Sequence, residues 1–292
     1  MHKGSIVAIV TPFDREGNFD EDAFRKLIEF QIENGTDGIV PCGSTGEAAT
    51  LDHNGHTEVI RACVAQVKGR VPIIAGTGSN STSEAVELTR AAKLAGADAA
   101  LLITPYYNKP SPEGLYQHFK TVADAVALPQ ILYNVPGRTG INLDPQTTVR
   151  LAEHPHIVGL KDASGGVSQA GEILARTGED FVILSGDDSL TLPFMAIGGK
   201  GVISVTANIM PAAIKKLVTA VEENRWADAR RQHLALLELH NILFIESNPS
   251  PVKAALERMG LCSARVRLPL VTLQPQSLEA LQAVMLRYGL IS

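Results

Sequence analysis

The chain has 292 residues, of which 45% are hydrophobic and 20% are charged, and its formal net charge at pH 7 is -5. Such a chain can bury a large core, and its net negative charge argues against nucleic acid or an anionic membrane as a partner. Length alone does not divide it, because barrels of alternating strands and helices exceed 250 residues as single units.

Eight short apolar runs, rich in β-branched residues, recur along the chain with helical patterns between them. Their starts lie 19 to 33 residues apart, which leaves room for a crossover helix between successive parallel strands. Most runs are continuously apolar, as expected for parallel strands that are covered on both faces. The runs begin at residues 5, 38, 71, 99, 128, 157, 182 and 201.

The intervening segments have the periodicity and the end signals of helices. Residues 20–35 open with acidic side chains and close on a glycine, and residues 81–96 open with a capping box formed by Ser81 and Glu84. Eight such units predict a TIM (β/α)8 barrel. A doubly wound open sheet is disfavoured, because "TPFD" after the first strand lacks the glycine-rich fingerprint.

The predicted barrel occupies residues 1–224, and residues 225–292 form a C-terminal extension of three helices. These helices are expected within 226–246, 250–260 and 277–289, with a break at the proline-containing "SNPSP". The three cysteines, Cys42, Cys63 and Cys262, have no C-x-x-C spacing and favour a reducing compartment. No apolar run reaches the roughly 18 residues that a membrane span needs, so we expect a cytoplasmic protein.

In TIM barrels the chemistry lies at the carboxyl ends of the strands. Lys161 ends the sixth predicted strand and alternates with the small residues Gly159 and Ala163, which would leave a hollow for a long side chain if this face of the strand is the barrel interior. An unpartnered buried ammonium is costly, so this lysine is a candidate nucleophile that attacks a carbonyl and forms a Schiff base. The alternative is a lysine that reaches solvent or pairs with Asp162.

Phenols and hydroxyls end the neighbouring strands. Tyr133 ends the fifth strand, where it could move protons while an imine forms, and Ser44, Thr45 and Tyr107 could complete a relay. Arg138, in the turn after the fifth strand, suits a carboxylate. Together these groups favour covalent chemistry on a small keto acid without a metal; taken singly, each fits a surface role as well.

The motifs "GSTGE", "YYNKP", "YNVPGRT", "GLKDASG", "SGDD" and "FIESNPSPVK" occur in this order and spacing. They resemble the dihydrodipicolinate synthase branch of the N-acetylneuraminate lyase family of pyruvate-dependent class I aldolases, and the resemblance covers essentially the whole chain. It implies a homotetramer that needs no cofactor. The implied reaction condenses pyruvate with L-aspartate 4-semialdehyde to 4-hydroxy-tetrahydrodipicolinate, the entry step to lysine and diaminopimelate.

The resemblance also implies a role for each candidate residue. Lys161 would form the Schiff base with pyruvate, Tyr133 would shuttle protons, and Ser44 and Tyr107 would complete the relay, with Tyr107 reaching in from a neighbouring subunit. Arg138 would bind the carboxylate of the semialdehyde. The pyruvate carboxylate would lie against the hydroxyl of Thr45 and the backbone of Ser44, and the pocket would be lined by the backbone of Gly186 and Ile203.

One position departs from the synthase pattern, which has two threonines where this chain has Ser44 and Thr45. Serine keeps the hydroxyl but loses the methyl group that restricts its rotamer. Ser-Thr resembles the lyase branch, so N-acetylneuraminate lyase or another pyruvate aldolase stays an alternative, although Arg138 favours the synthase. A barrel that serves only as a non-catalytic scaffold is a further alternative, against which Lys161, Tyr133 and Arg138 together argue.

A second site follows from the same resemblance. In synthases that are inhibited by L-lysine, the matching residues line a lysine site at a subunit interface, and this chain has all of them, with Ala48 where serine is common. We therefore expect feedback inhibition. The H-x-x-H spacing within this set could instead indicate a metal, but no third ligand is evident. The set is Ala49, His53, His56, Asn80, Glu84 and Tyr106.

Overall fold

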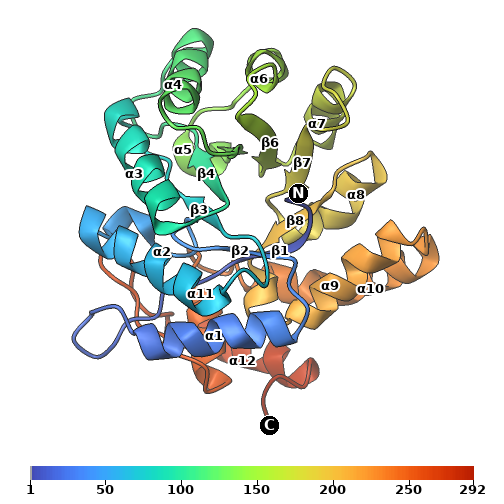
Figure 1. Cartoon of the computed structure of the whole chain (residues 1–292). Helices are drawn as coiled ribbons and strands as arrows, with labels where there is room; N and C mark the ends of the chain where they lie inside the picture. The colour runs from blue at the N-terminus through green and yellow to red at the C-terminus, as the bar shows by residue number, and fades with distance from the viewer. Residues whose placement is uncertain (1) are drawn as a thin grey trace.

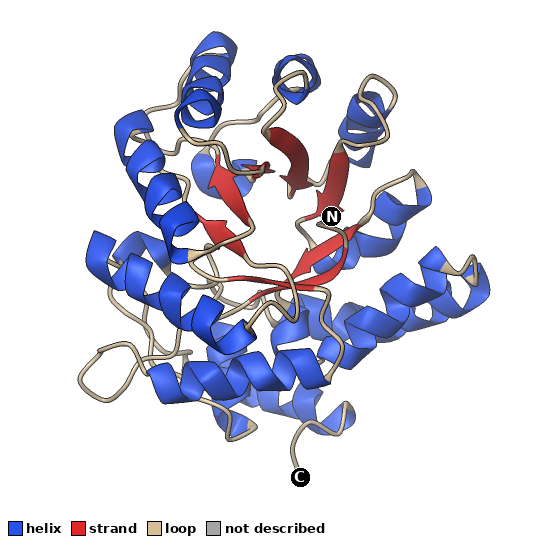
Figure 2. Ribbon diagram, in the orientation of Figure 1, coloured by secondary structure: helices blue, strands red, loops and turns tan. Residues whose placement is uncertain are grey.

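The computed structural model describes residues 2–292, in which eight parallel strands form an inner ring surrounded by helices (Figures 1 and 2). Each predicted apolar run overlaps one strand, so the predicted (β/α)8 barrel is confirmed. The strands are β1 (Gly4–Ala8), β2 (Gly38–Val40), β3 (Ile74–Gly76), β4 (Ala99–Ile103), β5 (Gln130–Asn134), β6 (Ile157–Asp162), β7 (Val182–Ser185) and β8 (Gly201–Ser204).

The strands are hydrogen-bonded in the order β2-β1-β8-β7-β6-β5-β4-β3. A parallel bridge between Ile39 and Ile73 joins the two ends of this order. The Ile39 N–H donates to the Pro72 carbonyl at 3.0 Å, and the Gly76 N–H donates to the Pro41 carbonyl at 2.9 Å. The sheet thereby closes on itself, which brings the carboxyl ends of all the strands to one end of the barrel.

Helices follow the strands on the outside of the ring (Figure 2). The barrel helices are α1 (Glu21–Glu33), α2 (His53–Val67), α3 (Thr82–Ala95), α4 (Pro112–Ala125), α5 (Pro136–Thr139), α6 (Pro145–Ala152), α7 (Val167–Leu174), α8 (Thr191–Ala196) and α9 (Pro211–Glu222). The predicted C-terminal helices are also present, as α10 (Trp226–Ile242), α11 (Ser250–Arg258) and α12 (Pro275–Arg287). Short 3-10 turns follow β2, β7 and β8, at η1 (Ala48–Thr50), η2 (Asp188–Leu190) and η3 (Thr206–Asn208).

The start of α3 differs in part from the prediction. The Ser81 hydroxyl accepts from the Glu84 N–H at 3.5 Å, so Ser81 is the N-cap residue, and Gly96 ends the helix with a φ of +96°. The second half of the predicted capping box is wrong. The Glu84 carboxylate does not return to the Ser81 N–H but accepts from Ser79 and contacts His53. The Ser81 N–H donates to the Ser79 hydroxyl at 3.0 Å instead.

Alternation along the strands divides the core into two layers. Side chains of one parity fill the barrel interior, and those of the other parity pack against the helices. On β5, β6 and β7, the residues Leu132, Leu160 and Ile183 belong to the outer layer. Ile131, Tyr133, Val182 and Leu184 belong to the interior, so Lys161, which pairs with Tyr133 and Leu184, also points inward.

The C-terminal extension is fastened to the barrel at the carboxyl ends of the strands. α10 packs along α9, and α11 contacts η3 and α12. The Lys253 side chain on α11 is fully buried, and its Nζ donates to the Thr11 carbonyl at 2.8 Å and to Glu47 Oε1 at 2.7 Å. The Arg267 N–H donates to Glu47 Oε2 at 2.9 Å. The extension therefore contacts the loop that carries the "GSTGE" motif.

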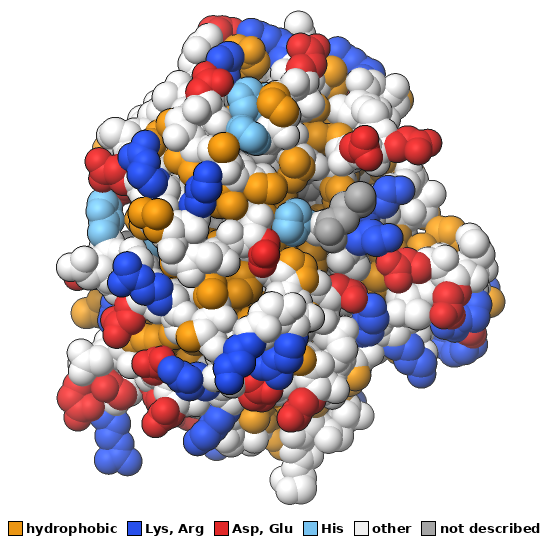
Figure 3. All heavy atoms as spheres, viewed as in Figure 1, with side chains coloured by type: hydrophobic (Ala, Val, Ile, Leu, Met, Phe, Trp, Pro, Cys, Tyr) orange, Lys and Arg blue, Asp and Glu red, His pale blue; other side chains and the backbone are white. Residues whose placement is uncertain are grey.

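Acidic and basic side chains are interspersed on the face shown in Figure 3, as the modest net charge predicts. Among residues 2–292, none of the helices combines the length and the hydropathy needed to cross a bilayer. The "IGGKG" segment, with Gly198, Gly199 and Lys200, lies beside Lys3 and Gly4 at the amino ends of the strands. This glycine-rich segment therefore lies at the opposite end of the barrel from the carboxyl ends of the strands, where TIM barrels bind phosphate.

Candidate active site at the carboxyl ends of the strands

Lys161 and Tyr133 lie side by side at the carboxyl ends of β6 and β5, where the parallel register pairs them directly. The Lys161 Nζ is 4.1 Å from the centroid of the Tyr133 ring, and both side chains are 6% exposed. Lys161 has no ion pair with Asp162 among the residues that the structure describes. Asp162 instead accepts from the Ser164 N–H at 2.8 Å, and burial raises the pKa of its carboxyl. The pairing alternative for Lys161 is thus wrong.

Small residues surround Lys161, as the alternation on β6 predicts. A Cβ atom on Gly159 would come within 2.5 Å of the Val182 carbonyl oxygen, so β6 and β7 approach closely there only because this residue is glycine. A Cβ atom on Gly186, just beyond β7, would lie 2.8 Å from the Cβ of Ala163. These positions leave the interior at this end of the barrel to the lysine and the tyrosine.

The loop after β2 carries Ser44 and Thr45 and has a constrained backbone. Cys42 and Glu47 both have a φ of +55°, a left-handed conformation that non-glycine residues adopt rarely. The Thr11 hydroxyl donates to the Gly46 carbonyl at 2.7 Å. Thr45 is buried, and its hydroxyl accepts from the side-chain amide of Asn248 at 2.9 Å.

Arg138 lies on α5, directly after β5. Its guanidinium donates to the backbone carbonyl of Asn248 at 3.1 Å. Asn248 lies between α10 and α11 and is 4% exposed. One residue of the extension therefore joins two predicted site residues, Thr45 and Arg138, which are 93 positions apart in the sequence.

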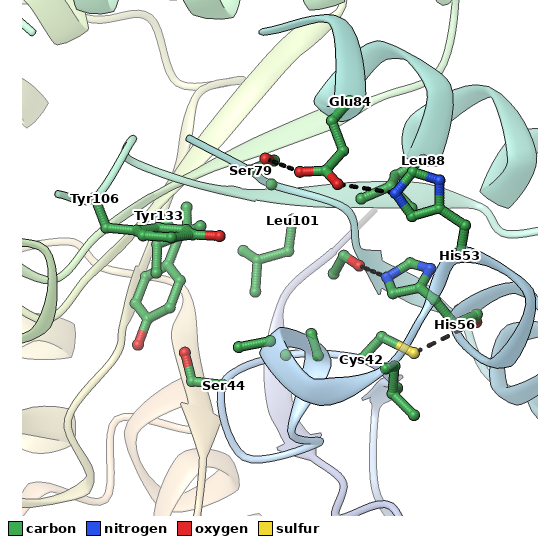
Figure 4. A pocket seen from close by; sticks show the side chains of 17 residues that line it. Cys42, Ser44, His53, His56, Ser79, Glu84, Leu88, Leu101, Tyr106 and Tyr133 are labelled. Carbon is green, nitrogen blue, oxygen red and sulfur yellow. Dashed lines mark hydrogen bonds and ion pairs between the residues drawn. The ribbon is translucent and has the colours of Figure 1, made fainter. Parts of the chain in front are cut away.

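A cavity of about 180 Å³ opens between β2, β3, β4 and β5 (Figure 4). Ser44 and Tyr133 lie at one end of it, and Figure 4 shows their side chains pointing toward one another. At the other end are His53 and Glu84. Of the six residues predicted to bind L-lysine, five line this cavity: Ala49, His53, His56, Glu84 and Tyr106.

Glu84 is the acidic centre of that second end. It contacts the His53 Nε2 at 2.8 Å and accepts from the Ser79 hydroxyl. These two contacts, with Ser79 the stronger, hold the pKa of Glu84 below its usual value, and Glu84 in turn raises the pKa of His53. His56 is separate: its Nε2 lies 2.7 Å from the Gly76 carbonyl, and burial lowers its pKa. The two histidines of the H-x-x-H spacing thus have different partners.

The two adjacent tyrosines have different environments. Tyr106 lines the cavity, and its carbonyl accepts from the Asn80 side chain at 3.2 Å, which brings Asn80, the sixth predicted residue, to the same place. Tyr107 has a φ of +71° and is 90% exposed. Among residues 2–292, no hydrogen bond joins it to Tyr133. Gly186 and Ile203 do not line the cavity either; Ile203 is buried in the barrel interior on β8.

Sequence reasoning assigned no role to three residues near the site: Glu47, Asn248 and Lys253. All three stand in the motifs "GSTGE" and "FIESNPSPVK", so the signal was present. The Asp187 carboxylate caps η2, where it accepts from the Ser189 N–H at 2.9 Å. Asp188 is different: its buried carboxylate accepts from the backbone after β8, at Val205 and Thr206, and from Ser204.

The fold and the site define a (β/α)8 barrel protein with a buried lysine beside a tyrosine at the carboxyl ends of the strands. The model of the dihydrodipicolinate synthetase family matches residues 1–287, and the chain belongs to this family. The 4-hydroxy-tetrahydrodipicolinate synthase of Syntrophotalea carbinolica is 65% identical over 291 residues, which cover 100% of this chain and 99% of that protein.

Solved structures of this family have the same fold. The chloride-inhibited dihydrodipicolinate synthase from Acinetobacter baumannii, complexed with pyruvate, is 50% identical, with a TM-score of 0.98 and 100% of both chains covered. The synthase from Cyanidioschyzon merolae with lysine bound is 40% identical, with a TM-score of 0.97 and 99% of both chains covered.

Proposed function

We propose that this chain condenses pyruvate with L-aspartate 4-semialdehyde to 4-hydroxy-tetrahydrodipicolinate, the entry step to lysine and diaminopimelate. The observation that carries the proposal is the buried Lys161 amine next to the Tyr133 phenol, in a chain 65% identical to a 4-hydroxy-tetrahydrodipicolinate synthase. A buried amine without a carboxylate partner suits attack on a carbonyl better than a structural role.

In the proposed reaction, the Lys161 amine adds to the ketone carbon of pyruvate, water leaves, and an imine forms. Loss of a proton from the methyl group gives an enamine, whose carbon attacks the aldehyde of the second substrate; the new alkoxide takes up a proton. The amino group of that substrate then attacks the imine carbon and releases the Lys161 amine, which closes the six-membered ring.

Protons move during each of these steps, and Tyr133 and Ser44 are placed to carry them. Their side chains point toward one another in the cavity (Figure 4), and a hydroxyl both donates and accepts. Tyr107 would extend the relay from a neighbouring subunit, and its 90% exposure leaves it available for such a contact. Homotetramer formation in the cytoplasm is part of the proposal, and the assembly is measured by analytical ultracentrifugation.

The substrate carboxylates have separate partners in the proposal. The Thr45 hydroxyl and the Ser44 backbone bind the pyruvate carboxylate, with the backbone of Gly186 and Ile203 nearby. The Arg138 guanidinium binds the carboxylate of the semialdehyde, since its planar donors match that group. A lyase that acts on a sialic acid has no amino-acid carboxylate to place there.

Trapping tests the covalent step. Borohydride added with pyruvate should leave a reduced adduct on Lys161, located by peptide mass spectrometry, and Lys161→Arg should show none. An unmodified lysine in the native protein would refute the mechanism. Pyruvate consumption is then measured with aspartate semialdehyde and, separately, with N-acetylmannosamine. Consumption with the amino sugar alone would place the chain in the lyase branch, and no consumption with either would support another pyruvate aldolase or a scaffold.

We also propose that L-lysine binds at the far end of the cavity and inhibits the reaction. The Glu84 carboxylate, whose pKa is held low by Ser79 and His53, remains ionised at neutral pH and suits an amino group. The synthase from Cyanidioschyzon merolae was solved with lysine bound. Activity measured against L-lysine should fall, and Glu84→Gln should abolish the fall. Glu87→Gln, an exposed change on the same helix, is the control; an activity curve that stays flat to millimolar lysine would reject the proposal.

A further inference from the structure

Asn248 contacts two predicted substrate-binding residues from outside the barrel strands. Its side-chain Nδ2 donates to the Thr45 hydroxyl at 2.9 Å, and its backbone carbonyl accepts from the Arg138 guanidinium at 3.1 Å. The residue is buried between α10 and α11. These contacts place one residue of the C-terminal extension between the groups that bind the two substrates.

The direction of the Thr45 contact determines what the threonine can do. An amide N–H only donates, so in this contact the Thr45 oxygen is the acceptor. The Thr45 hydroxyl has no acceptor among the described residues, and its own proton is therefore free for a further bond. Thr45 directly follows Ser44, which lines the cavity.

We infer that Asn248 is a positioning residue that keeps Thr45 a hydrogen-bond donor toward the carboxylate of pyruvate. The inference rests on the proposed function. A hydroxyl that already accepts from an amide is directed to donate elsewhere, and a bond from a polarised donor to a carboxylate is stronger than a bond between neutral groups.

The two backbone segments that carry Asn248 and Thr45 are also joined through Glu47. Glu47, two residues after Thr45, is bound by Lys253 and by the Arg267 N–H, both from the extension. The loop that carries Thr45 and the segment that carries Asn248 are therefore joined at two points. A fixed backbone on both sides lets a side-chain amide set the orientation of one hydroxyl.

Two substitutions of Asn248 distinguish the direction of its hydrogen bond to Thr45 from the packing of its side chain. Asn248→Ala removes the donor and should raise the KM for pyruvate about 5- to 10-fold, as loss of one hydrogen bond does. Asn248→Asp keeps the shape but can only accept when ionised, so it reverses the bond and adds a like charge near the substrate. Its KM for pyruvate should be at least about tenfold higher than that of the alanine variant.

The KM for the semialdehyde should stay within about twofold in Asn248→Ala, because the backbone carbonyl that binds Arg138 is retained and leaves that subsite intact. Asn241→Asp, an exposed change on α10, is the control for added charge. A merely structural role would lower kcat and raise both KM values together. Equal KM values for pyruvate in the aspartate variant and the native protein would overturn the inference.

A double variant tests the inference even if the carboxylate introduced by Asn248→Asp prevents folding. Thr45→Val has no hydroxyl to orient, so Asn248→Ala in that background should change the KM for pyruvate no further. Independent, multiplying effects would overturn the inference. Trapping of pyruvate on Lys161 in the native protein is measured first: without that adduct the proposed function fails, and with it only the role of Asn248 is in question.

Discussion

The buried contact between Lys253 and Glu47 gives the sharpest stability prediction. Both side chains are almost completely buried, at 0% and 1% exposure. Burial lowers the pKa of Lys253, and the nearby Glu47 carboxylate opposes that fall. Lys253→Met removes the cation and leaves the Glu47 carboxylate buried with the Arg267 N–H as its partner. Breaking a buried pair in this way costs about 3–5 kcal/mol.

Glu47→Gln should cost a similar amount, because it removes the negative charge beside the Lys253 ammonium. The Thr11 carbonyl, which is neutral, still accepts from that ammonium. The double variant Lys253→Met/Glu47→Gln buries no net charge. It should therefore be more stable than the sum of the single effects predicts, by about 2 kcal/mol, as is usual for groups in direct contact.

The free energy of unfolding is measured by urea denaturation at one protomer concentration, because self-association would add to the apparent stability. Lys215→Met is the matched control: Lys215 forms a contact of 2.6 Å with Asp37, but both side chains are about one-third exposed. Its cost should stay near 1 kcal/mol. A Lys253→Met cost below about 1 kcal/mol, or strictly additive effects in the double variant, would refute the reasoning.

Three further predictions follow from single positions. Gly159→Ala should destabilise the protein by about 1–3 kcal/mol in the same urea assay, because its Cβ atom would lie 2.5 Å from the Val182 carbonyl oxygen. Burial lowers the pKa of His118 to about 4. As the pH falls below 6.5, the unfolded state therefore protonates this histidine before the folded state does. The free energy of unfolding should fall between pH 6.5 and 4 for this reason, by about 2 kcal/mol at pH 5. In His118→Gln that part of the pH dependence should be absent. Ser44→Ala should lower kcat at least about 100-fold if Ser44 carries protons, and Ser44→Thr, which restores the hydroxyl, should stay within about threefold in a steady-state assay; equal rates for Ser44→Ala and the native protein would exclude the relay.

Periodicity was enough to predict the barrel, and it left the direction of the Lys161 side chain as a condition of the argument. The runs of apolar residues predicted the strands, and alternation placed Gly159, Lys161 and Ala163 on one face of β6, because successive strand residues point to opposite sides. The structure shows that this face is the barrel interior, since Lys161 pairs with Tyr133 and Leu184. Which residues act at the strand ends came from the motifs and the family resemblance rather than from periodicity.

Contacts between loops could not be predicted from the sequence pattern. The bond between Asn248 and Thr45 joins positions 203 residues apart, and no local signal records such a pairing. The left-handed φ of Glu47 is equally invisible, since glutamate has no preference for that conformation. At Ser81 and Glu84 the capping-box pattern competes with Ser79, five residues before Glu84, and with His53, which only the folded chain brings near.

The position of the C-terminal extension determines when, during synthesis, the chain can become active. Chains are synthesised and begin to fold from the amino end, so the eight strands are complete at Ser204 while Asn248, Lys253 and Arg267 are still to come. A barrel that has just closed lacks the groups that hold Thr45, Glu47 and Arg138. Full activity therefore requires the last quarter of the polypeptide, and an incompletely synthesised chain should have little activity on its substrates.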